Sequence, residues 1–384
     1  MRIATVFGTR PEAIKLAPLC FACDRAGVEN HVVVTGQHRE LLDKALADFS
    51  VKPQHDLNVM RANQDLFHTT SAVLLGLRDI LRSIRPDWVV VQGDTTTCFA
   101  GALAAFYEKI PVAHVEAGLR TGQRYSPFPE EINRRLAGVL ADVHFAPTGR
   151  ARDNLLREGV ADADILVTGN TGIDALRWIL EHRRADFHAC LPPAAAAAVE
   201  GRFLLLTTHR RESFGGPMLD ALAAVRDVCE ATPGLNVVFP VHPNPNVREQ
   251  VRRVLSNVGQ VHLVDPLDYV TFSHLMARAT LVVTDSGGIQ EEAPSVSRPV
   301  VVLRESTERP EGVEAGVAVL VGTDRTRVRS VPTSTATPAS TPSGRSVLSR
   351  STTTGRDTDG ASSWIPPESV TTSVALAIRW EKVT

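Results

Sequence analysis

The sequence has little that would place the protein in a membrane or outside the cell. Its 384 residues contain no run close to the roughly 18 consecutive apolar residues that cross a bilayer. The opening residues, MRIATVFGTRPEAIK, lack the charged, apolar and small-residue regions of a secretory signal peptide. A cytoplasmic location is therefore the expectation, with no membrane partner.

Cysteine and net charge are also scarce. The five cysteines, at positions 20, 23, 98, 190 and 229, are odd in number and scattered, which argues against a disulfide framework. Cys20 and Cys23 form a C-x-x-C pair, but no further ligands follow nearby, so we interpret them as buried thiols on a helix and expect no metal. A net charge of -2 provides no basic face for nucleic acid, although one local basic site would suffice for a small anion.

What the sequence does contain is a regular alternation of apolar runs and amphipathic stretches. Continuous apolar strands separated by helices are typical of an α/β protein with a parallel sheet covered on both faces. The expected strands are residues 3–7, 31–35, 88–92, 111–115, 203–207, 236–240, 280–284 and 299–303, and the clearest helices are residues 11–24, 66–83 and 96–107.

Length and a break in this rhythm indicate two domains. A single core stops growing near roughly 250–300 residues, and the alternation pauses at residues 181–200, which contain two prolines and an alanine run. We predict two Rossmann-like doubly wound domains, at residues 1–180 and 201–326, with a hinge or linker at 181–200 and a cleft between them. Ligands of open α/β sheets bind beyond the carboxyl ends of the strands, so the loops after the strands are the candidate sites.

Two loops of the first half carry charged side chains directly after a strand. Residues 8–12, GTRPE, turn into a helix, where the helix dipole, backbone N–H groups, Arg10 and Lys15 favour an anion. The alternative is an ordinary turn with a solvated arginine, and the G-x-G-x-x-G fingerprint of dinucleotide sites is absent. Asp94 follows the strand at 88–92 within QGDTTT, where capping of the next helix is the alternative role.

A third region adds two more carboxylates. Glu116 lies in HVEAGLRT, after the strand at 111–115, and Glu130 lies in SPFPEEINR at the start of a helix. Acids in a first helical turn also suit the helix dipole, which is the alternative reading of Glu130. Carboxylates from separate loops, brought together in one cleft, would push their pKa values up and apart, and acid and base roles arise in that way.

The second half offers basic and glycine-rich loops. His209, in THRRESFG, follows a strand and suits a phosphate or a developing charge, with a structural histidine as the alternative. In TDSGGIQEEA, two glycines let the backbone approach a ligand and Glu292 can take a ribose diol, unless the glycines serve only helix packing. Arg309, in RESTERPE, precedes a helical turn and has a solvated charged loop as its alternative.

Together these loops resemble the non-hydrolysing UDP-N-acetylglucosamine 2-epimerases. Eight segments match in family order over about 325 residues: FGTRPEAIKLAP, QGDTTT, HVEAGLRTG, YSPFPEEINR, THRRESFG, PVHPNPNVRE, TDSGGIQEEAPS and TERPEGVEAG. The resemblance implies a GT-B-like domain pair and reversible conversion of UDP-N-acetylglucosamine to UDP-N-acetylmannosamine, with no nicotinamide or metal cofactor. The implied route removes the C2 proton and expels UDP to leave a 2-acetamidoglucal, and UDP then re-adds with protonation on the opposite face.

The motif match also implies roles for individual residues. Asp94, Glu116 and Glu130 are the acid/base candidates, and His209 stabilises the leaving diphosphate or takes part in proton transfer. The substrate-binding positions are Arg10, Lys15, Phe272 (beside the uracil), Ser286, Gly287, Gly288, Glu292 and Arg309. The resemblance further implies a homodimer and a place in cell-surface polysaccharide biosynthesis. Candidates for a second substrate site that acts as an effector site are Gln37, His38, Arg39, Arg210 and His242.

The resemblance ends near Thr326. Residues 330–363 are half Ser and Thr and keep no helical or strand period, which predicts a disordered tail at 327–384. The family continues here with helices that complete the second domain, so our hypothesis is a shifted reading frame near Thr326. Translation of the coding DNA in its other frames tests this hypothesis.

Other functions remain as alternatives. A GT-B-like glycosyltransferase would share the UDP site but would need an acceptor. An inactive UDP-sugar binder, disabled by the tail, would bind its ligand without turnover. A hydrolysing epimerase, which releases free N-acetylmannosamine and UDP, matches the motifs less well.

Overall fold

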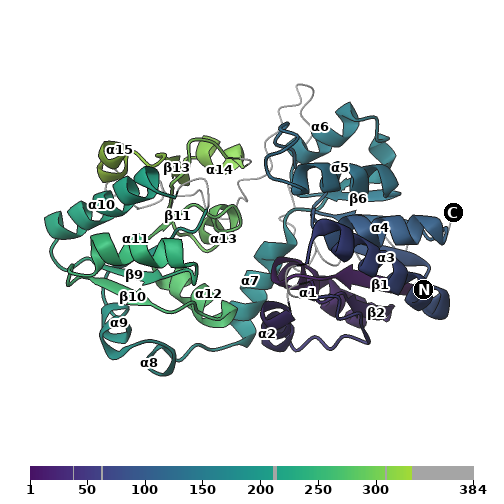
Figure 1. The fold of residues 1–384 in the computed structure, drawn as a ribbon, viewed down its shortest axis with the longest axis horizontal. Helices are drawn as coiled ribbons and strands as arrows, with labels where there is room; N and C mark the ends of the chain where they lie inside the picture. Colours follow the sequence, from purple (N-terminus) through teal and green to yellow (C-terminus); the bar gives the residue numbers. More distant parts are fainter. Residues whose placement is uncertain (38, 62–63, 211–213, 308, 331–384) are drawn as a thin grey trace, which may run out of the picture. The chain divides into compact units, whose positions relative to one another are not determined.

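The structure is a computed structural model that describes residues 1–330 except 38, 62–63, 211–213 and 308. The chain divides into two compact units, which we call unit 1 (Met1–Trp178) and unit 2 (from Ile179 onward), coloured purple to teal and teal to yellow in Figure 1. Of the expected tail, residues 331–384 lie outside the described residues.

Unit 1 is built on a seven-stranded, all-parallel sheet of order β3-β2-β1-β4-β5-β6-β7. The strands are β1 (Arg2–Phe7), β2 (Glu29–Val34), β3 (His55–Asp56), β4 (Trp88–Gln92), β5 (Val112–Val115), β6 (Val143–Ala146) and β7 (Ile165–Val167). The helices are α1 (Arg10–Arg25), α2 (Arg39–Phe49), α3 (Leu66–Ile84), α4 (Thr96–Tyr107), α5 (Glu130–Leu140) and α6 (Gly149–Arg157). A further helix, α7 (Thr171–His182), begins in unit 1 and continues into unit 2 from Ile179.

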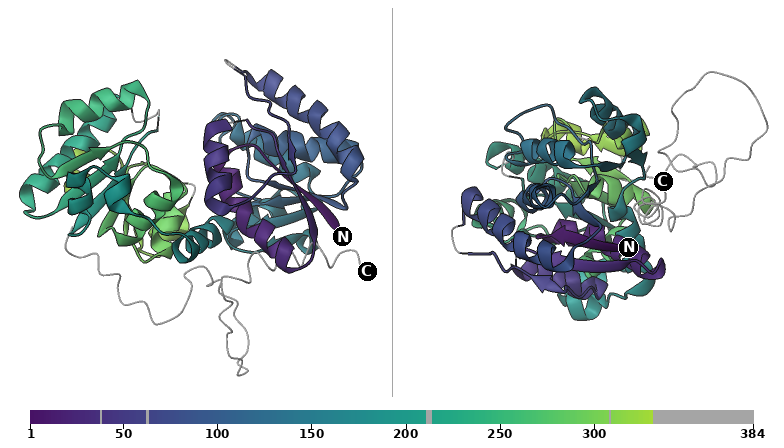
Figure 2. Two further views of the ribbon diagram at one scale, coloured as in Figure 1. Left: turned by 90° about the horizontal axis from the view of Figure 1, so that it is seen from below. Right: turned by 90° about the vertical axis from the view of Figure 1, so that its right-hand side faces the viewer.

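Helix α3 shows why these segments pack as they do. Its buried positions include Val73, Leu77 and Leu81, which recur every fourth residue and therefore form one apolar face. Asp65 caps the helix by accepting a hydrogen bond from the backbone N–H of His68 at 2.7 Å. The side chains of this face join the core of the sheet, and each fully buried leucine contributes about 1.5–3 kcal/mol. The helix itself packs beside α4 in unit 1, whose ribbon is drawn from two further sides in Figure 2.

Unit 2 repeats this plan with a six-stranded parallel sheet of order β10-β9-β8-β11-β12-β13. The strands are β8 (Phe203–Thr207), β9 (Asn236–Pro240), β10 (Val261–Val264), β11 (Leu281–Thr284), β12 (Val300–Val302) and β13 (Ala318–Leu320). The helices are α8 (Phe187–Cys190), α9 (Pro193–Ala198), α10 (Gly216–Ala231), α11 (Pro245–Leu255), α12 (Tyr269–Arg278), α13 (Ile289–Ser295), α14 (Pro310–Glu314) and α15 (Arg325–Arg329).

Both sheets are doubly wound, which confirms the predicted fold class. The strand order reverses between β1 and β4 in unit 1 and between β8 and β11 in unit 2. At such a switch point the loops leave the sheet in opposite directions, and ligands bind at the carboxyl ends of the strands there. None of the helices in the described ranges combines the length and the hydropathy that crossing a bilayer requires.

The segments at the two expected boundaries of unit 2 are helical. Residues 181–200, expected as a hinge or linker, contain α8 and α9, and α9 packs beside β9 and β10. Arg278 lies over the Phe187 ring at 5.2 Å and donates to the carbonyl of Val199, so this segment is fastened to unit 2. At the other end, α15 packs on α10 and buries Val328, beyond residue 326 where the sequence pattern weakens.

Candidate active site

A buried glutamate, Glu12, fixes the conformation of the loop after β1 by hydrogen bonds. A Cβ at Gly8 would lie 2.1 Å from Thr35 Oγ1, so only glycine fits there. Glu12, which is 1% exposed, accepts hydrogen bonds from the backbone N–H groups of Gly8 and Thr9 at 3.0 and 2.8 Å. These N–H groups, expected to attract an anion, are therefore occupied by the protein itself, and an anion here would rely on the Arg10 side chain.

Glu12 also connects this loop to the neighbouring loop of the switch point. Thr95, which follows β4, donates its hydroxyl to Glu12 at 2.6 Å. Burial raises the pKa of Glu12, while its hydrogen bonds to Thr95, Gly8 and Thr9 lower it. The sequence analysis gave Glu12 no role, and its position in the first turn of α1 was the only signal for one.

Lys15 lies one turn further along α1 and contacts a candidate catalytic carboxylate. Its ammonium group donates to Glu116 at 2.7 Å (Oε1) and 2.5 Å (Oε2), and Gln92 donates to the same carboxylate. The Glu116 side chain is 7% exposed, and its backbone φ of 61° turns the chain sharply after β5. Lys15, assigned by motif to the nucleotide, is thus paired with Glu116 in this structure.

Asp94 follows β4 and lies beside Arg134 of α5. Arg134 Nη2 is 2.5 Å from Asp94 Oδ2, and the Asn133 side chain donates to the Asp94 carbonyl at 3.0 Å. Withdrawal from water and the charge of Glu116 raise the pKa of Asp94, against the opposite effects of Arg134 and Lys15. Because the Asp94 side chain keeps 31% of its surface exposed, this desolvation is incomplete.

Glu130 begins α5 and completes a group that we call the carboxylate cluster, Asp94, Glu116 and Glu130. Burial raises the pKa of Glu130, and the charge of Asp94 adds to the effect while Arg134 opposes it. Asp94 is thus coupled electrostatically to both glutamates. Two connections at the carboxyl edge of one sheet, β4–α4 with Asp94 and β5–α5 with Glu116 and Glu130 at its two ends, carry these groups, an arrangement suited to acid/base chemistry.

The neighbouring Glu131 is structural. It is 1% exposed and accepts hydrogen bonds from the backbone N–H groups of Thr121 and Gly122, each at 3.1 Å. It also lies 3.4 Å from Arg134. Glu131 therefore fixes the loop that leads from β5 to α5, a role that the sequence analysis missed because both glutamates of the EE pair suit a helix N-terminus.

In unit 2, His209 lies at the corresponding switch point. Strands β8 and β11 are joined there by a 2.7 Å hydrogen bond between the hydroxyls of Thr207 and Thr284. The His209 side chain, 44% exposed, lies next to the buried Asp285 and stacks on His242 with ring centroids 5.6 Å apart. The exposed edge of this imidazole is available to a ligand.

The loop after β11 leaves open space above the first turn of α13. Gly288 has an ordinary helical φ of -63°, and a Cβ there would meet no atom within 4 Å. Neither backbone conformation nor packing therefore requires glycine at this position, and its lack of a side chain leaves room for another molecule. Ser286 and Gly287 are partly exposed beside it, and Tyr269 donates to Glu292 Oε1 at 3.4 Å.

Arg309 is brought to the same helix. Its Nε donates to Glu291 at 2.6 Å, and Thr307 donates its hydroxyl to Gln290 at 2.6 Å, so the loop before α14 is tied to α13. Phe272, on α12, is partly buried. Unit 2 thus collects Ser286, Gly287, Gly288, Glu292 and Arg309 around the N-terminal half of α13.

The second-site candidates fall in both units. In unit 1, Gln37 accepts a hydrogen bond from a threonine hydroxyl at 2.9 Å, and Arg39 is paired with two aspartates at 2.6 and 2.5 Å. In unit 2, His242 stacks on His209 and Arg210 donates its backbone N–H to Asp285. His38 lies outside the described residues.

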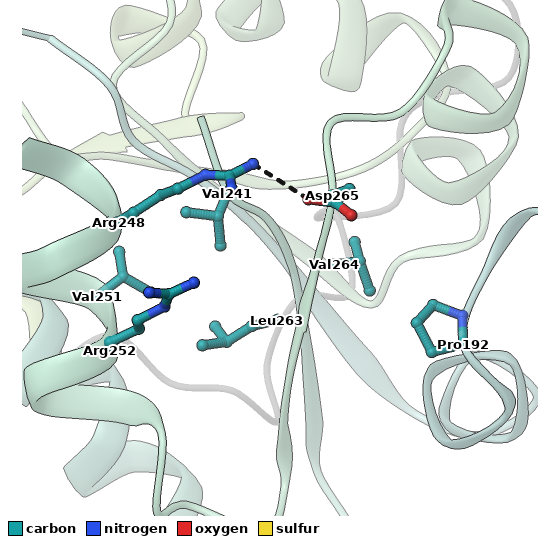
Figure 3. Close-up of a pocket in the computed structure, with 8 residues that line it drawn as sticks. All are labelled: Pro192, Val241, Arg248, Val251, Arg252, Leu263, Val264 and Asp265. Carbon is teal, nitrogen blue, oxygen red and sulfur yellow. Dashed lines mark hydrogen bonds and ion pairs between the residues drawn. The ribbon is translucent and has the colours of Figure 1, made fainter. Parts of the chain in front are cut away.

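A pocket elsewhere in unit 2 holds none of the candidate residues. It lies between α11 and β10, where Arg248 is 3.1 Å from Asp265 (Figure 3). Its lining residues are Pro192, Val241, Arg248, Val251, Arg252, Leu263, Val264 and Asp265. Its volume of about 190 Å³ is below the roughly 300–1,000 Å³ typical of sites for larger organic ligands, so it does not suit a nucleotide sugar.

Cysteines and metal ligands add no further chemistry to the described part of the chain. Cys20 and Cys23 are buried on α1, and burial raises the pKa of the Cys20 thiol to about 12. Among the described residues, no group of three or more histidine, cysteine, aspartate or glutamate side chains could hold a metal ion.

Comparison with known proteins identifies similar chains. The model of the UDP-N-acetylglucosamine 2-epimerase family matches residues 22–344. UDP-N-acetylglucosamine 2-epimerase of Escherichia coli (strain K12) is 51% identical over 335 residues, which are 85% of this chain and 88% of the relative. The Bacillus subtilis (strain 168) enzyme of the same name is 49% identical over 329 residues, 85% of each chain. The structure of UDP-GlcNAc 2-epimerase from Neisseria meningitidis bound to UDP-GlcNAc matches with a TM-score of 0.77 at 44% identity, covering 86% of this chain and 90% of that chain.

Proposed function

Since this chain belongs to the UDP-N-acetylglucosamine 2-epimerase family, we propose that it converts UDP-N-acetylglucosamine reversibly to UDP-N-acetylmannosamine without net hydrolysis. The observation that carries the proposal is the carboxylate cluster of unit 1, in which desolvation raises the pKa values of Asp94 and Glu130. Inversion at C2 needs a base on one face of the sugar and an acid on the other, and carboxyl groups with raised pKa values suit both tasks near neutral pH.

The proposed reaction proceeds by elimination and re-addition. A carboxylate of the cluster takes the C2 proton, and the C2–H electron pair forms a C1=C2 double bond. The C1–O bond to UDP breaks at the same time, and UDP leaves with that electron pair, so that a 2-acetamidoglucal remains. A UDP oxygen then attacks C1 while a carboxylic acid protonates C2 on the opposite face.

Two further groups of residues fit the departing UDP. Gly288 and its neighbours leave open space at α13, where Ser286, Gly287, Glu292 and Arg309 are candidates for the nucleotide, with Phe272 beside the uracil. In unit 2, the exposed imidazole of His209 is suited to the charge of the diphosphate; in unit 1, Arg10 is a separate candidate for binding a negative charge. Lys15 neutralises Glu116 in this structure, and UDP would compete with Glu116 for its ammonium group.

The test is incubation of the purified chain with UDP-N-acetylglucosamine in heavy water, followed by proton NMR. We expect UDP-N-acetylmannosamine that carries deuterium at C2, and loss of this product in the variants Glu116→Gln and Glu130→Gln. Free N-acetylmannosamine formed in step with turnover would instead establish a hydrolysing enzyme. Turnover only with an added acceptor would establish a glycosyltransferase, and binding without turnover would establish an inactive UDP-sugar binder.

We also propose a homodimer and a cytoplasmic role in supplying cell-surface polysaccharide biosynthesis. The family resemblance supports both, and α4 and α5, which lie side by side, carry exposed apolar side chains that a second copy could cover. Phe106, Tyr107 and Val139 are 58%, 63% and 83% exposed. Light scattering should give twice the mass of the chain, and Val139→Glu should return it to one chain mass; a monomeric native protein would end the proposal.

A further inference from the structure

Asp285 is a fully buried carboxylate at the switch point of unit 2. It directly follows β11 and is 0% exposed. Its Oδ2 accepts three hydrogen bonds from the loop after β8: from the Thr208 hydroxyl at 2.8 Å, from the His209 N–H at 2.8 Å and from the Arg210 N–H at 2.9 Å. Because all three partners are donors towards it, this oxygen acts only as an acceptor.

The second oxygen of Asp285 faces the ring of His209. His209 Nδ1 is 3.3 Å from Asp285 Oδ1, which is ion-pair distance without hydrogen-bond geometry, and Oδ1 has no hydrogen bond to any described residue. Although burial raises the pKa of Asp285, its contacts with His209 and with the backbone lower the pKa below the ordinary value, so the carboxyl is ionised. An ionised carboxylate oxygen at this distance attracts an N–H and repels a lone pair, so it favours the neutral tautomer that carries its proton on Nδ1.

The other side of the imidazole is open. The His209 side chain is 44% exposed, and no hydrogen bond within the described ranges engages its Nε2. The His242 ring lies nearly parallel to it, at an interplanar angle of 15°, and limits its rotation. The ring is therefore oriented by two groups and presents one nitrogen outward.

We propose that Asp285 is a positioning residue that holds His209 in the Nδ1–H tautomer and so makes Nε2 the atom that meets the substrate. The inference rests on the role proposed above for His209. With its lone pair on Nε2, the ring can accept a proton there. The resulting imidazolium keeps its charge beside the Asp285 carboxylate and can donate from Nε2 to the diphosphate.

The variant Asp285→Asn distinguishes this positioning role from a purely structural one, in which Asp285 only holds the loop after β8 in place. The three hydrogen-bond donors around Oδ2 need an acceptor, and of the two amide atoms only the oxygen is one. The amide oxygen must therefore take the place of Oδ2, and the contacts with the loop persist. The amide NH₂ must then occupy the place of Oδ1, where it donates to Nδ1. The Asp285→Asn variant therefore keeps the loop but inverts the tautomer to Nε2–H, which removes the outward lone pair.

The first measurement is ¹⁵N NMR of the histidine-labelled protein, with the His209 signals identified by their absence in His209→Gln. In the native protein we expect the protonated nitrogen at Nδ1 and the lone pair at Nε2, and in Asp285→Asn the reverse. A native ring protonated at Nε2 would overturn the proposal without need of any variant. An unchanged tautomer in Asp285→Asn would overturn it as well.

The second measurement compares the kinetics of the same variants. We expect kcat of Asp285→Asn to fall by about 10²-fold or more, as for an inverted histidine tautomer in other enzymes, while the Kd for UDP changes less than about twofold. The control is Asp324→Asn, which alters a helix-capping aspartate of the same unit and should leave kcat and the tautomer unchanged. A native kcat in Asp285→Asn despite an inverted tautomer would refute the positioning role. Full activity of His209→Gln would instead refute the role of His209 itself, whatever the tautomer.

Discussion

Asp174 gives a prediction in which stability should depend on pH in a defined direction. It lies in the first turn of α7, and its Oδ2 is buried without a hydrogen bond to any residue that the structure describes. Burial raises the pKa of Asp174 from 3.8 to about 7, with Arg177 acting in the opposite direction. The folded protein therefore binds this proton more tightly than the unfolded chain does.

The sign and size of the effect follow from this difference. Well below pH 3.8 the carboxyl is protonated in both states, and the free energy of unfolding does not depend on its titration. As the pH rises from 3.8 to about 7, the unfolded chain ionises first, so the free energy of unfolding falls. At 1.36 kcal/mol per pKa unit the total loss is roughly 4 kcal/mol, of which about 2–3 kcal/mol falls between pH 5 and pH 8.

The assay is urea denaturation of the native protein and of Asp174→Asn at pH 5 and pH 8. Asparagine does not titrate. The free energy of unfolding of the variant, relative to that of the native protein, should therefore be about 2–3 kcal/mol higher at pH 8 than at pH 5. Asp153→Asn, which changes an exposed aspartate of the same unit, is the matched control and should show no such gain. If the difference between native protein and Asp174→Asn is the same at both pH values, the carboxyl is not held protonated by burial and the reasoning fails.

Three further changes test the geometry of unit 1 and the burial of the thiols. Gly8→Ala should lower the free energy of unfolding by about 1–3 kcal/mol, because its Cβ would lie 2.1 and 2.4 Å from two threonine hydroxyls, whereas Gly149→Ala meets no atom within 4 Å and should not lower the urea midpoint. Of the five cysteines Cys190 is exposed and the others are buried, so one thiol should react rapidly with a disulfide reagent at pH 8 and Cys190→Ser should remove that phase; a second fast thiol would contradict the burial. Arg134→Gln removes a cation that lowers the pKa of Asp94, so the acid limb of the kcat/KM profile should move to higher pH, and an unmoved limb would show that Asp94 is not the group titrating there.

The sequence predicted the central elements of both sheets closely. The expected ranges 88–92, 96–107, 203–207 and 236–240 coincide with β4, α4, β8 and β9. These elements are buried, so the apolar pattern that specifies them is continuous. Among the described strands, the sequence analysis missed β6, which is buried but has only four residues, and the four edge strands β3, β7, β10 and β13, which have two to four residues. Their patterns are too short and too mixed to stand out from a loop.

The candidate site could be located from the sequence, but its partners could not. Placement directly after a strand was enough to put Asp94 and Glu116 at the carboxyl edge of a parallel sheet. It could not show that Lys15 pairs with Glu116, because the two residues are 101 positions apart, Lys15 on α1 and Glu116 in the loop after β5. The role of Arg134, 40 positions from Asp94, was hidden for the same reason. Pairing depends on side-chain direction at the switch point, which a single sequence does not encode in any local pattern.

The two switch points share one feature: a buried carboxylate accepts hydrogen bonds from backbone N–H groups of a loop that follows a central strand. In unit 1, Glu12 accepts the backbone N–H groups of the loop after β1 and the hydroxyl of Thr95 after β4. In unit 2, Asp285 follows β11 and accepts the N–H groups of His209 and Arg210 after β8. Each buried carboxylate thus ties the two central loops of its sheet together and uses the N–H groups that would otherwise bind an anion. Within each unit, this leaves fewer backbone N–H groups of these two loops for an anion, and in unit 2 the open turn at Gly288 has no such carboxylate contact among the described hydrogen bonds.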